Sequence, residues 1–398
     1  MSYGSPMTQI FDLFSESDLS DAIAAKLVKA TKHPDCDDVI FNYTDAAMWT
    51  PGAWENPAVR VCRGLIVGDE NEVIARPWPK FFNVGQPEAA KIELDEPVEV
   101  TDKMDGSLGI IYVDINGVPA VATRGSFSSE QAVHATAWLR ERIEQTGWFP
   151  WNSYPTPLVE IIYPENRIVL DYGATNELIL LGAVDRETGE TYGPEEARVA
   201  LNWPWRTTLT YEYGTLKDAL AAPARKNAEG FVVRTHDGRM VKIKQEDYKL
   251  MHRVLFGMSA RTIWQALAVE ACRDMIHDPR HWGSYLGIDA QIVEGMPKFH
   301  DLIDTPGIPD EVRDWAVAVS DDIIRGRAEL LLEAGVLAGQ VLDLDPREQW
   351  EAVKNNPLRG EILTYARKGD IVPLTLKSWR LARPTGTKTP FSRNEDIA

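Results

Sequence analysis

Residues 103–113 read Lys103-Met104-Asp105-Gly106-Ser107-Leu108-Gly109-Ile110-Ile111-Tyr112-Val113, and the fold can be worked outward from this stretch. The apolar run 108–113 precedes Asn116-Gly117, which is the strongest two-residue turn signal, and 118–123 returns as a second strand. Residues 97–125 are therefore predicted to form a β-hairpin. Lys103 should lie near a strand-to-strand turn at its start.

The segments after this hairpin predict one helix and more strands. Ser128 and Ser129 offer an N-cap, apolar residues recur at helical spacing over 132–143, and Gly147 closes the segment. Strands are predicted at 158–163, 167–172, 177–184, 229–235 and 239–244. Residues 1–250 are thus expected to form an α+β domain built mainly on antiparallel sheet.

The hydrophobic period changes after Tyr248. Apolar residues recur as on a helix from Ile263 to Met275 and again over 312–323, with Pro309 ahead of the second run and Gly335 past it. Residues 251–398 are therefore expected to form an all-helical C-terminal domain. A mobile tail is expected after about residue 383.

Charge and length exclude some classes of protein. The length of 398 residues favours two domains. The net charge of −18 argues against a protein that coats nucleic acid with one basic face. Phosphate contacts are expected instead at two basic clusters. The alternative interpretation, that these clusters are a solvated charged face and a free tail, stays open. Their members are Arg225, Lys226, Arg234, Arg239, Lys242, Lys244, Lys249 and Arg253 in the first, and Lys377, Arg380, Arg383, Lys388 and Arg393 in the second.

The cysteines indicate neither a disulfide scaffold nor a zinc ribbon. The chain has three, without C-x-x-C spacing, which fits a reducing compartment. Cys272 lies near His277 and His281, but Pro279 interrupts the helix that would align the two histidines, and a fourth ligand is missing. No apolar run approaches the length of a membrane span, and the protein is expected in the cytoplasm.

Lys103 is a candidate nucleophile. A free lysine amine has a pKa of about 10.4 and reacts poorly at neutral pH, but neighbouring cations lower that pKa. Lys242 and Lys244, with a divalent metal ion, could supply these charges if the two predicted hairpins face one another. The same cations would stabilise a phosphoryl group under attack.

The neighbours of Lys103 suit such a site. Gly106 leaves room for a phosphate or ribose to approach the backbone, and Asp105 and Ser107 can hold the turn by local hydrogen bonds. Taken alone, K-x-D-G is more often an ordinary exposed turn. The ordered strings that follow it favour the functional interpretation.

Four ordered strings carry a family resemblance. They are Lys103-Met104-Asp105-Gly106-Ser107, Leu158-Val159-Glu160-Ile161, Glu229-Gly230-Phe231-Val232-Val233 and Val241-Lys242-Ile243-Lys244. They resemble motifs I, III, IV and V of the covalent nucleotidyltransferase superfamily. Flanking strings, over roughly residues 40–250, are similar to the RNA ligase 1 family of T-even phages: Cys62-Arg63-Gly64, Arg76-Pro77-Trp78-Pro79-Lys80-Phe81-Phe82-Asn83 and Asn166-Arg167-Ile168-Val169.

The resemblance implies a reaction and a set of residues. Lys103 would attack the α-phosphate of ATP, AMP would move to an RNA 5′-phosphate, and a 3′-hydroxyl would displace AMP. Mg²⁺ is implied, with Mn²⁺ as a substitute. The implied catalytic residues are Lys103, Glu229, Lys242 and Lys244, and the implied metal ligands are Glu160 and Glu229. The implied nucleotide-binding residues are Tyr43, Arg63, Lys80, Phe82, Asp105, Gly106, Arg124, Glu160, Gly230, Lys242, Lys244 and Tyr248.

The resemblance also implies partners and a source. The substrate would be single-stranded or stem-loop RNA, which could be tRNA, and a kinase–phosphatase could prepare its ends. The helical domain would support RNA recognition, and a phage origin is indicated.

Three alternatives stay open at this point. An ATP-dependent DNA ligase or a capping guanylyltransferase shares the four motifs, but each continues into an OB-fold, which would appear as short alternating strands. A non-catalytic RNA-binding protein on the same scaffold would have no need of the lysines and Glu229 together. For individual residues, a core position is an equal alternative for Phe82, and a core or surface role is favoured for Tyr43.

Overall fold

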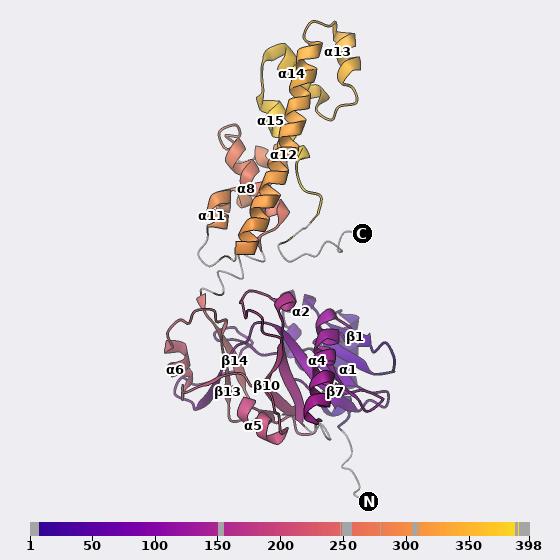
Figure 1. The fold of residues 1–398 in the computed structure, drawn as a ribbon, viewed down its shortest axis with the longest axis vertical. Coiled ribbons are helices and arrows are strands. Elements are labelled where there is room, and N and C mark those ends of the chain that lie inside the picture. The colour runs from indigo at the N-terminus through magenta and orange to yellow at the C-terminus, as the bar shows by residue number, and fades with distance from the viewer. Residues whose placement is uncertain are drawn as a thin grey trace, which may run out of the picture. The chain divides into compact units, whose positions relative to one another are not determined.

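The structure is a computed structural model of the chain. It describes residues 8–149, 155–246, 248, 257–278, 280–304, 308, 310–386 and 389. The chain divides into two compact units, Met1–Tyr248 and Lys249–Ala398, and Figure 1 draws most of the second in orange and yellow.

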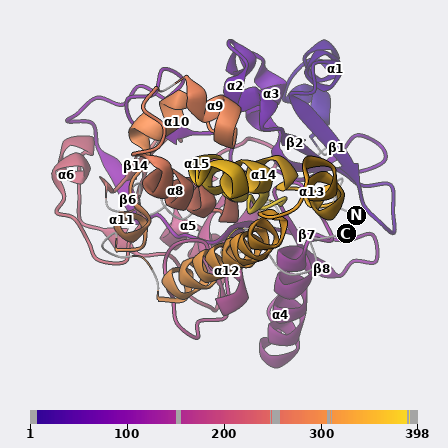
Figure 2. The ribbon, with the colours of Figure 1, turned by 90° about the horizontal axis from the view of Figure 1, so that it is seen from above.

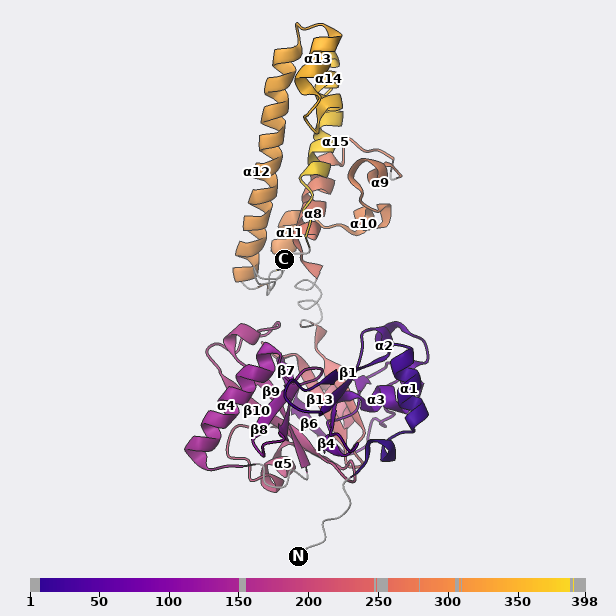
Figure 3. The same cartoon turned by 90° about the vertical axis from the view of Figure 1, so that its right-hand side faces the viewer.

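Three sheets form the first unit (Figure 3). A four-stranded sheet has the order β1 (Val28–Lys32), β2 (Val39–Tyr43), β3 (Arg63–Val67), β4 (Val73–Ala75). The sheet that we call the β7 sheet has the order β11 (Thr191–Tyr192), β10 (Glu177–Asp185), β9 (Pro155–Ile162), β7 (Ser107–Val113), β8 (Pro119–Thr123). The β13 sheet has the order β12 (Thr210–Tyr211), β6 (Val98–Asp102), β13 (Gly230–Thr235), β14 (Met240–Lys244), β5 (Phe82–Asn83). Neighbouring strands pair antiparallel, except that β5 and β14 run parallel.

The helices of the first unit pack on these sheets. They are α1 (Glu16–Ala24), α2 (Ala46–Trp49), α3 (Pro57–Val61), α4 (Glu130–Thr146), α5 (Pro194–Ala200) and α6 (Leu216–Ala221). The predicted helix is confirmed as α4, because Ser129 Oγ accepts the backbone N–H of Ala132 and Gly147 ends the helix with a φ of 69°. It lies along the β7 sheet (Figure 3), where Leu139 packs into the same core cluster as Ile111.

Most of the predicted strands are confirmed. β7 and β8 pair from Gly109 opposite Thr123 to Val113 opposite Pro119, around a turn in which Gly117 has a φ of 73°. The strands predicted at 158–163, 177–184, 229–235 and 239–244 are β9, β10, β13 and β14.

The strand predicted at 167–172 is wrong. The backbone N–H groups of Val169 and Leu170 both donate to Oδ2 of Asp105, each at 2.8 Å. A side chain therefore takes the donors that a neighbouring strand would have taken. Val169 and Leu170 are buried, but in a loop instead of a sheet.

The described part of the second unit contains helices and no strand. They are α8 (Ala260–Cys272), α9 (His281–Leu286), α10 (Ala290–Gly295), α11 (Phe299–Ile303), α12 (Asp310–Val341), α13 (Pro346–Val353), α14 (Arg359–Lys368) and α15 (Val372–Leu381). In Figure 2, α8, α15, α14 and α13 follow one another beside α12. The fold class, α+β with an all-helical C-terminal part, is confirmed.

Two predicted helix ends in this unit are wrong. α8 ends at Cys272, before Met275, and α12 continues through Gly335 to Val341. One glycine costs a helix only about 1 kcal/mol, which the packing of a 32-residue helix can offset. None of the described helices has both the length and the apolar composition that a membrane crossing requires.

The first basic cluster is partly engaged inside the fold. Three of its arginines form ion pairs: Arg225 with Asp102, Arg234 with Glu99 and Glu196, and Arg239 with Glu96 and Asp237. These three arginines are therefore already paired with carboxylates of the same unit, and phosphate contact by this cluster stays a prediction. Lys249 and Arg253 lie outside the described residues.

The second basic cluster begins inside a helix. Lys377 and Arg380 belong to α15, and the Arg383 guanidinium carbon is 5.7 Å from the centre of a Trp264 ring. Lys388 and Arg393, and most of the tail predicted to be mobile, lie outside the described residues.

Candidate active site

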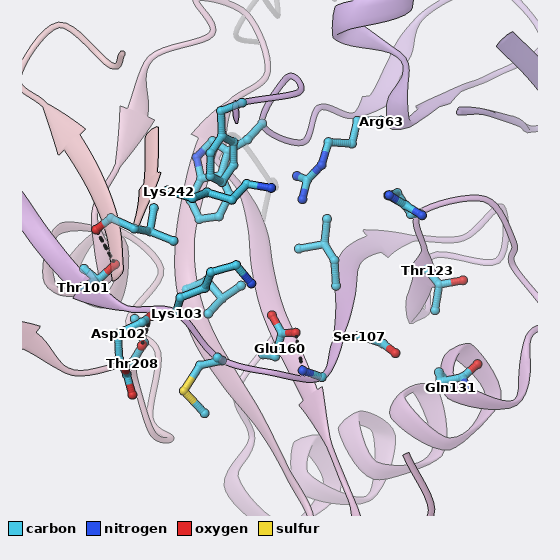
Figure 4. Close-up of a pocket in the computed structure, with 18 of the residues that line it drawn as sticks. Arg63, Thr101, Asp102, Lys103, Ser107, Thr123, Gln131, Glu160, Thr208 and Lys242 are labelled. Carbon is cyan, nitrogen blue, oxygen red and sulfur yellow. Dashed lines mark hydrogen bonds between the residues drawn. The ribbon is translucent and has the colours of Figure 1, made fainter. Parts of the chain in front are cut away.

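A cleft of about 630 Å³ opens in the first unit between the β7 sheet and the β13 sheet. Its size lies within the range of small-ligand pockets. Six predicted site residues line it: Arg63, Lys103, Gly106, Arg124, Glu160 and Lys242. Figure 4 shows the side chains of Lys103, Lys242, Arg63 and Glu160 converging on one space.

The K-x-D-G segment crosses from one sheet to the other. Lys103 directly follows β6 of the β13 sheet, and β7 of the other sheet begins at Ser107. The backbone N–H of Lys103 donates to the carbonyl of Gly230 at 3.0 Å. The N–H of Gly106 donates to Oε1 of Glu160 at 2.9 Å. Both ends of the crossing are therefore fixed beside motif strands.

Glu229 bridges two of the predicted catalytic lysines. Its Oε2 lies 2.5 Å from Nζ of Lys103, and its Oε1 lies 2.8 Å from Nζ of Lys244. The Glu229 side chain is only 3% exposed, so solvent screens these pairs much less than surface pairs. Of these three residues, Lys103 lines the cleft and the other two stand behind it.

Lys242 faces the cleft from β14, with its ammonium 4.9 Å from the centre of the Phe81 ring. Burial lowers the pKa of Lys242 to about 6, with further lowering from the positive charges of Arg63, Lys80 and the other two lysines. Burial also lowers the pKa of Arg63. Burial and neighbouring cations thus both disfavour the charged form of Lys242, and a bound anion would favour it.

Tyr43 joins two more of the predicted residues. Its hydroxyl accepts hydrogen bonds from Nζ of Lys80 at 3.2 Å and from Arg124 at 2.7 Å. Burial raises the pKa of Tyr43, but the charges of Arg124, Lys80 and Arg63 outweigh burial and lower the pKa overall. Arg124 lines the cleft, whereas Tyr43 and Lys80 stand behind its wall.

The phenylalanine that lines the cleft is Phe81 rather than Phe82. Phe82 is 3% exposed and packs edge to face on Trp54, with ring centres 5.2 Å apart. Successive side chains of an extended segment point to opposite sides, so one of the two had to face the core. The structure places Phe82 in the core position that the sequence left as an equal alternative.

Glu160 faces the cleft from β9. Burial raises the pKa of Glu160 to about 8; the charges of Glu229 and Asp105 also raise it, and that of Lys103 lowers it. Among the described residues, no group of three or more His, Cys, Asp or Glu side chains forms a ready-made metal site. A divalent ion beside Glu160 and Glu229 would therefore complete its shell with phosphate oxygens and water, as Mg²⁺ usually does.

Asp105 and Tyr248 form a buried brace. Besides the two N–H groups of the 167–172 loop, Asp105 accepts the hydroxyl of Tyr248 through Oδ1 at 2.7 Å. Ser107 bonds to Asn166, which is 59 positions away. The expected local hydrogen bonds of Asp105 and Ser107 are therefore wrong. Asp105 and Tyr248 thus use their polar atoms for hydrogen bonds inside the protein. These bonds hold the K-x-D-G segment in place.

The two predicted glycines serve close packing. Gly230 has a φ of 148°, and a Cβ there would lie 1.9 Å from the carbonyl oxygen of Ile243. A Cβ on Gly106 would lie 2.7 Å from the carbonyl oxygen of Ile161. Any larger residue would separate paired strands at both places.

Several cleft residues were not found from the sequence: Asn42, Trp78, Thr101, Asp102, Gln131, Leu181, Thr208 and Val232. Four polar atoms of cleft residues are buried without a hydrogen-bond partner in the described part of the chain: Asn42 Oδ1, one Arg63 guanidinium nitrogen, Trp78 Nε1 and Asp102 Oδ1. Of these, Asp102 Oδ1 lies in an ion pair with Arg225. Unpartnered buried polar groups cost stability, so their gathering here favours a site for a polar ligand. For Val232, strand alternation within its motif string was the signal available.

The site combines a lysine held by a carboxylate with a cationic cleft, which is the arrangement expected of a covalent nucleotidyltransferase. Residues 61–248 match the family model described as RNA ligase. The resemblance to the RNA ligase 1 family is thus confirmed over this region.

The chain is also similar to individual known proteins. The chain is 28% identical over 248 residues to a predicted RNA ligase of Thermovibrio ammonificans, covering 60% of this chain and 63% of the relative. It is 30% identical over 138 residues to RNA ligase 1 of bacteriophage TS2126, covering 31% and 34%. A solved archaeal ATP-dependent RNA ligase aligns at a TM-score of 0.42 and 18% identity, covering 81% of this chain and 79% of that one. The chain spans less than two thirds of the length of the two curated relatives.

Proposed function

We propose that the protein is an ATP-dependent RNA ligase with Lys103 as its nucleophile. The observation that carries the proposal is the 2.5 Å pairing of the Lys103 amine with Glu229 at the wall of the cationic cleft. The family match over residues 61–248 supports RNA as the substrate class.

In the first step, the amine of Lys103 attacks the α-phosphorus of ATP. A phosphorus–nitrogen bond forms as the bond to the oxygen of the β-phosphate breaks, and pyrophosphate leaves. The proton that the amine gives up can pass to Glu229, whose Oε2 is already within hydrogen-bond distance. Arg63 and Lys242 offset the charge that develops on the phosphate oxygens.

The next two steps reuse the same cleft. The adenylate moves from Lys103 to the 5′-phosphate of an RNA, and a 3′-hydroxyl then displaces AMP and forms a phosphodiester. Each step develops negative charge on oxygens around one phosphorus atom, so the same cations can stabilise all three transition states.

A divalent metal ion fits the donor set of this site. Glu160 and Glu229 would hold it, and when bound it would supply positive charge to the phosphate oxygens. Mg²⁺ with Mn²⁺ as a substitute stays a prediction. The same holds for tRNA or another stem-loop as substrate, a kinase–phosphatase partner, an RNA-recognition role for the second unit and a cytoplasmic location.

The proposal is tested by supplying labelled nucleotide and defined ends. With [α-³²P]ATP and Mg²⁺, the protein should acquire covalent label, and it should join single-stranded RNA ends that carry a 5′-phosphate and a 3′-hydroxyl. Labelling from GTP in place of ATP would instead indicate a guanylyltransferase. Sealing of nicked duplex DNA without RNA joining would contradict the substrate class.

Binding of ATP should be coupled to proton uptake by Lys242. Its pKa of about 6 leaves it mainly neutral at pH 7.5, and a bound triphosphate should raise that pKa because it favours the charged form. The apparent Kd for ATP should therefore rise with pH above 6, by up to about tenfold per unit. Calorimetry in buffers of different ionisation enthalpy measures the uptake. Lys242→Met corrects for titration of ATP itself, and an uptake equal in both proteins would contradict the prediction.

A further inference from the structure

Arg225 is turned into the first unit, behind the cleft. One terminal nitrogen lies 2.8 Å from the Asp102 carboxylate and also contacts the hydroxyl of Tyr211. The other donates to the carbonyl of Gly230 at 2.6 Å. The guanidinium carbon lies 4.7 Å from the ring centre of Tyr211 and 4.2 Å from that of Phe231. One side chain thus connects β12, β6 and β13.

These contacts fall beside the two residues that the proposed chemistry depends on. Asp102 is the last residue of β6 and directly precedes Lys103, and Gly230 is the first residue of β13 and directly follows Glu229. The Gly230 carbonyl also accepts the backbone N–H of Lys103 at 3.0 Å. Arg225 and Lys103 therefore share one acceptor at the junction of the two strands.

We propose that Arg225 is a positioning residue for the nucleophile: it clamps the end of β6 to the start of β13, so that Lys103 and Glu229 keep the relative placement that attack requires. The inference rests on the proposed function, because it concerns the adenylylation step.

The shape of the guanidinium is what this role needs. Its two terminal nitrogens reach a carboxylate and a carbonyl on different strands at once, and its flat face stacks between two rings. A lysine at the same position offers one compact ammonium group, which can pair with Asp102 but cannot span both acceptors. Arg225→Lys therefore keeps the charge of the pair and removes the clamp.

The kinetic effect should appear in the attack step rather than in nucleotide affinity. A displacement of about 1 Å from the in-line geometry can cost about 10²-fold in rate. The single-turnover rate of adenylylation at saturating ATP should thus fall by about 10²-fold in Arg225→Lys, with the ATP concentration for half-maximal rate changed by less than about threefold. Joining of an RNA supplied already adenylylated at its 5′ end requires no attack by Lys103, and it should stay within about threefold of the wild type.

A matched control exists on the same strand. Arg234 lies near the other end of β13, also bridges strands, and pairs with Glu99 at 3.0 Å and Glu196 at 2.6 Å. Arg234→Lys should leave the adenylylation rate within about threefold of the wild type. A comparable loss in this control would mean that any weakened strand junction slows the reaction, and it would overturn the specific role of Arg225.

A second variant guards against misfolding of the first. The double variant Arg225→Gln with Asp102→Asn removes both charges together, so no carboxylate is left unpaired, and its thermal midpoint should lie near that of the wild type. The adenylylation rate should still be low, because the clamp is absent. A wild-type rate in this folded variant, or in Arg225→Lys, would refute the proposal. Failure of the wild-type protein to become labelled would refute the proposed function instead.

Discussion

Replacement of Lys103 by arginine is expected to abolish covalent labelling by [α-³²P]ATP, a loss of about 10³-fold or more. Arginine keeps a positive charge beside Glu229, but a guanidinium stays protonated at any accessible pH and offers no free amine. The loss would therefore report the missing nucleophile and not the loss of the ion pair. Gel autoradiography after a fixed time, with folding checked by circular dichroism, measures it.

The chemical stability of the label and a surface control variant show whether the label is attached to the Lys103 amine. Label on the wild-type protein should be lost in acid and kept in alkali, because a phosphorus–nitrogen bond behaves in this way. Lys29→Arg, at an exposed position of β1, should label like the wild type. Wild-type labelling of the Lys103→Arg protein would place the nucleophile elsewhere.

Glu229→Gln is expected to lower the single-turnover adenylylation rate by about 10²- to 10³-fold. The carboxylate contacts Nζ of both Lys103 and Lys244, and the neutral amide would leave two ammonium groups without their counter-charge. It would also be a weak ligand for a divalent ion and no acceptor for the proton of the attacking amine. Rapid-quench assays over a range of Mg²⁺ concentrations would separate the metal effect from the rate effect.

A second glutamate serves as the reference for this substitution. Glu165 is exposed, close after the β9 motif, and Glu165→Gln changes the same charge without touching the cleft. Its rate should match that of the wild type. A rate for Glu229→Gln within threefold of the reference would show that Glu229 serves only to hold the strands together.

The sequence predicted the parts of the site that depend on order along the chain. Lys103, Glu229 and Lys244 come together because β6, β13 and β14 are neighbours in one sheet. Of these strands, β13 and β14 were visible in the sequence as runs on either side of a turn, whereas residues 98–102, which form β6, were counted with the hairpin predicted over 97–125. Lys242 lies near these residues because it is on β14 as well, two residues before Lys244. Local sequence patterns were therefore enough to predict those site residues that lie on strands paired with one another.

Long-range side-chain bonds account for most of what was missed. Asp105 was expected to bond within its own turn, yet its partners lie 64 to 143 positions away, and they turn a predicted strand into a loop. Arg225 was counted with a phosphate-binding cluster because its pairing with Asp102 across 123 positions leaves no local trace. Phe81 and Phe82 differ only in which face of one short segment each occupies. Such choices are made by the packed tertiary structure.

The bond between Asp105 and Tyr248 has a consequence for how far the first unit can be shortened. Tyr248 is the last residue of the first unit, and its hydroxyl is one of the three donors on the Asp105 carboxylate. A protein that stopped at Lys244, the last residue of the last motif, would lack that donor and leave Oδ1 of Asp105 without a partner. The shortest form of the first unit that folds alone should therefore be sought with its end beyond Tyr248, not at the border of the recognisable motifs.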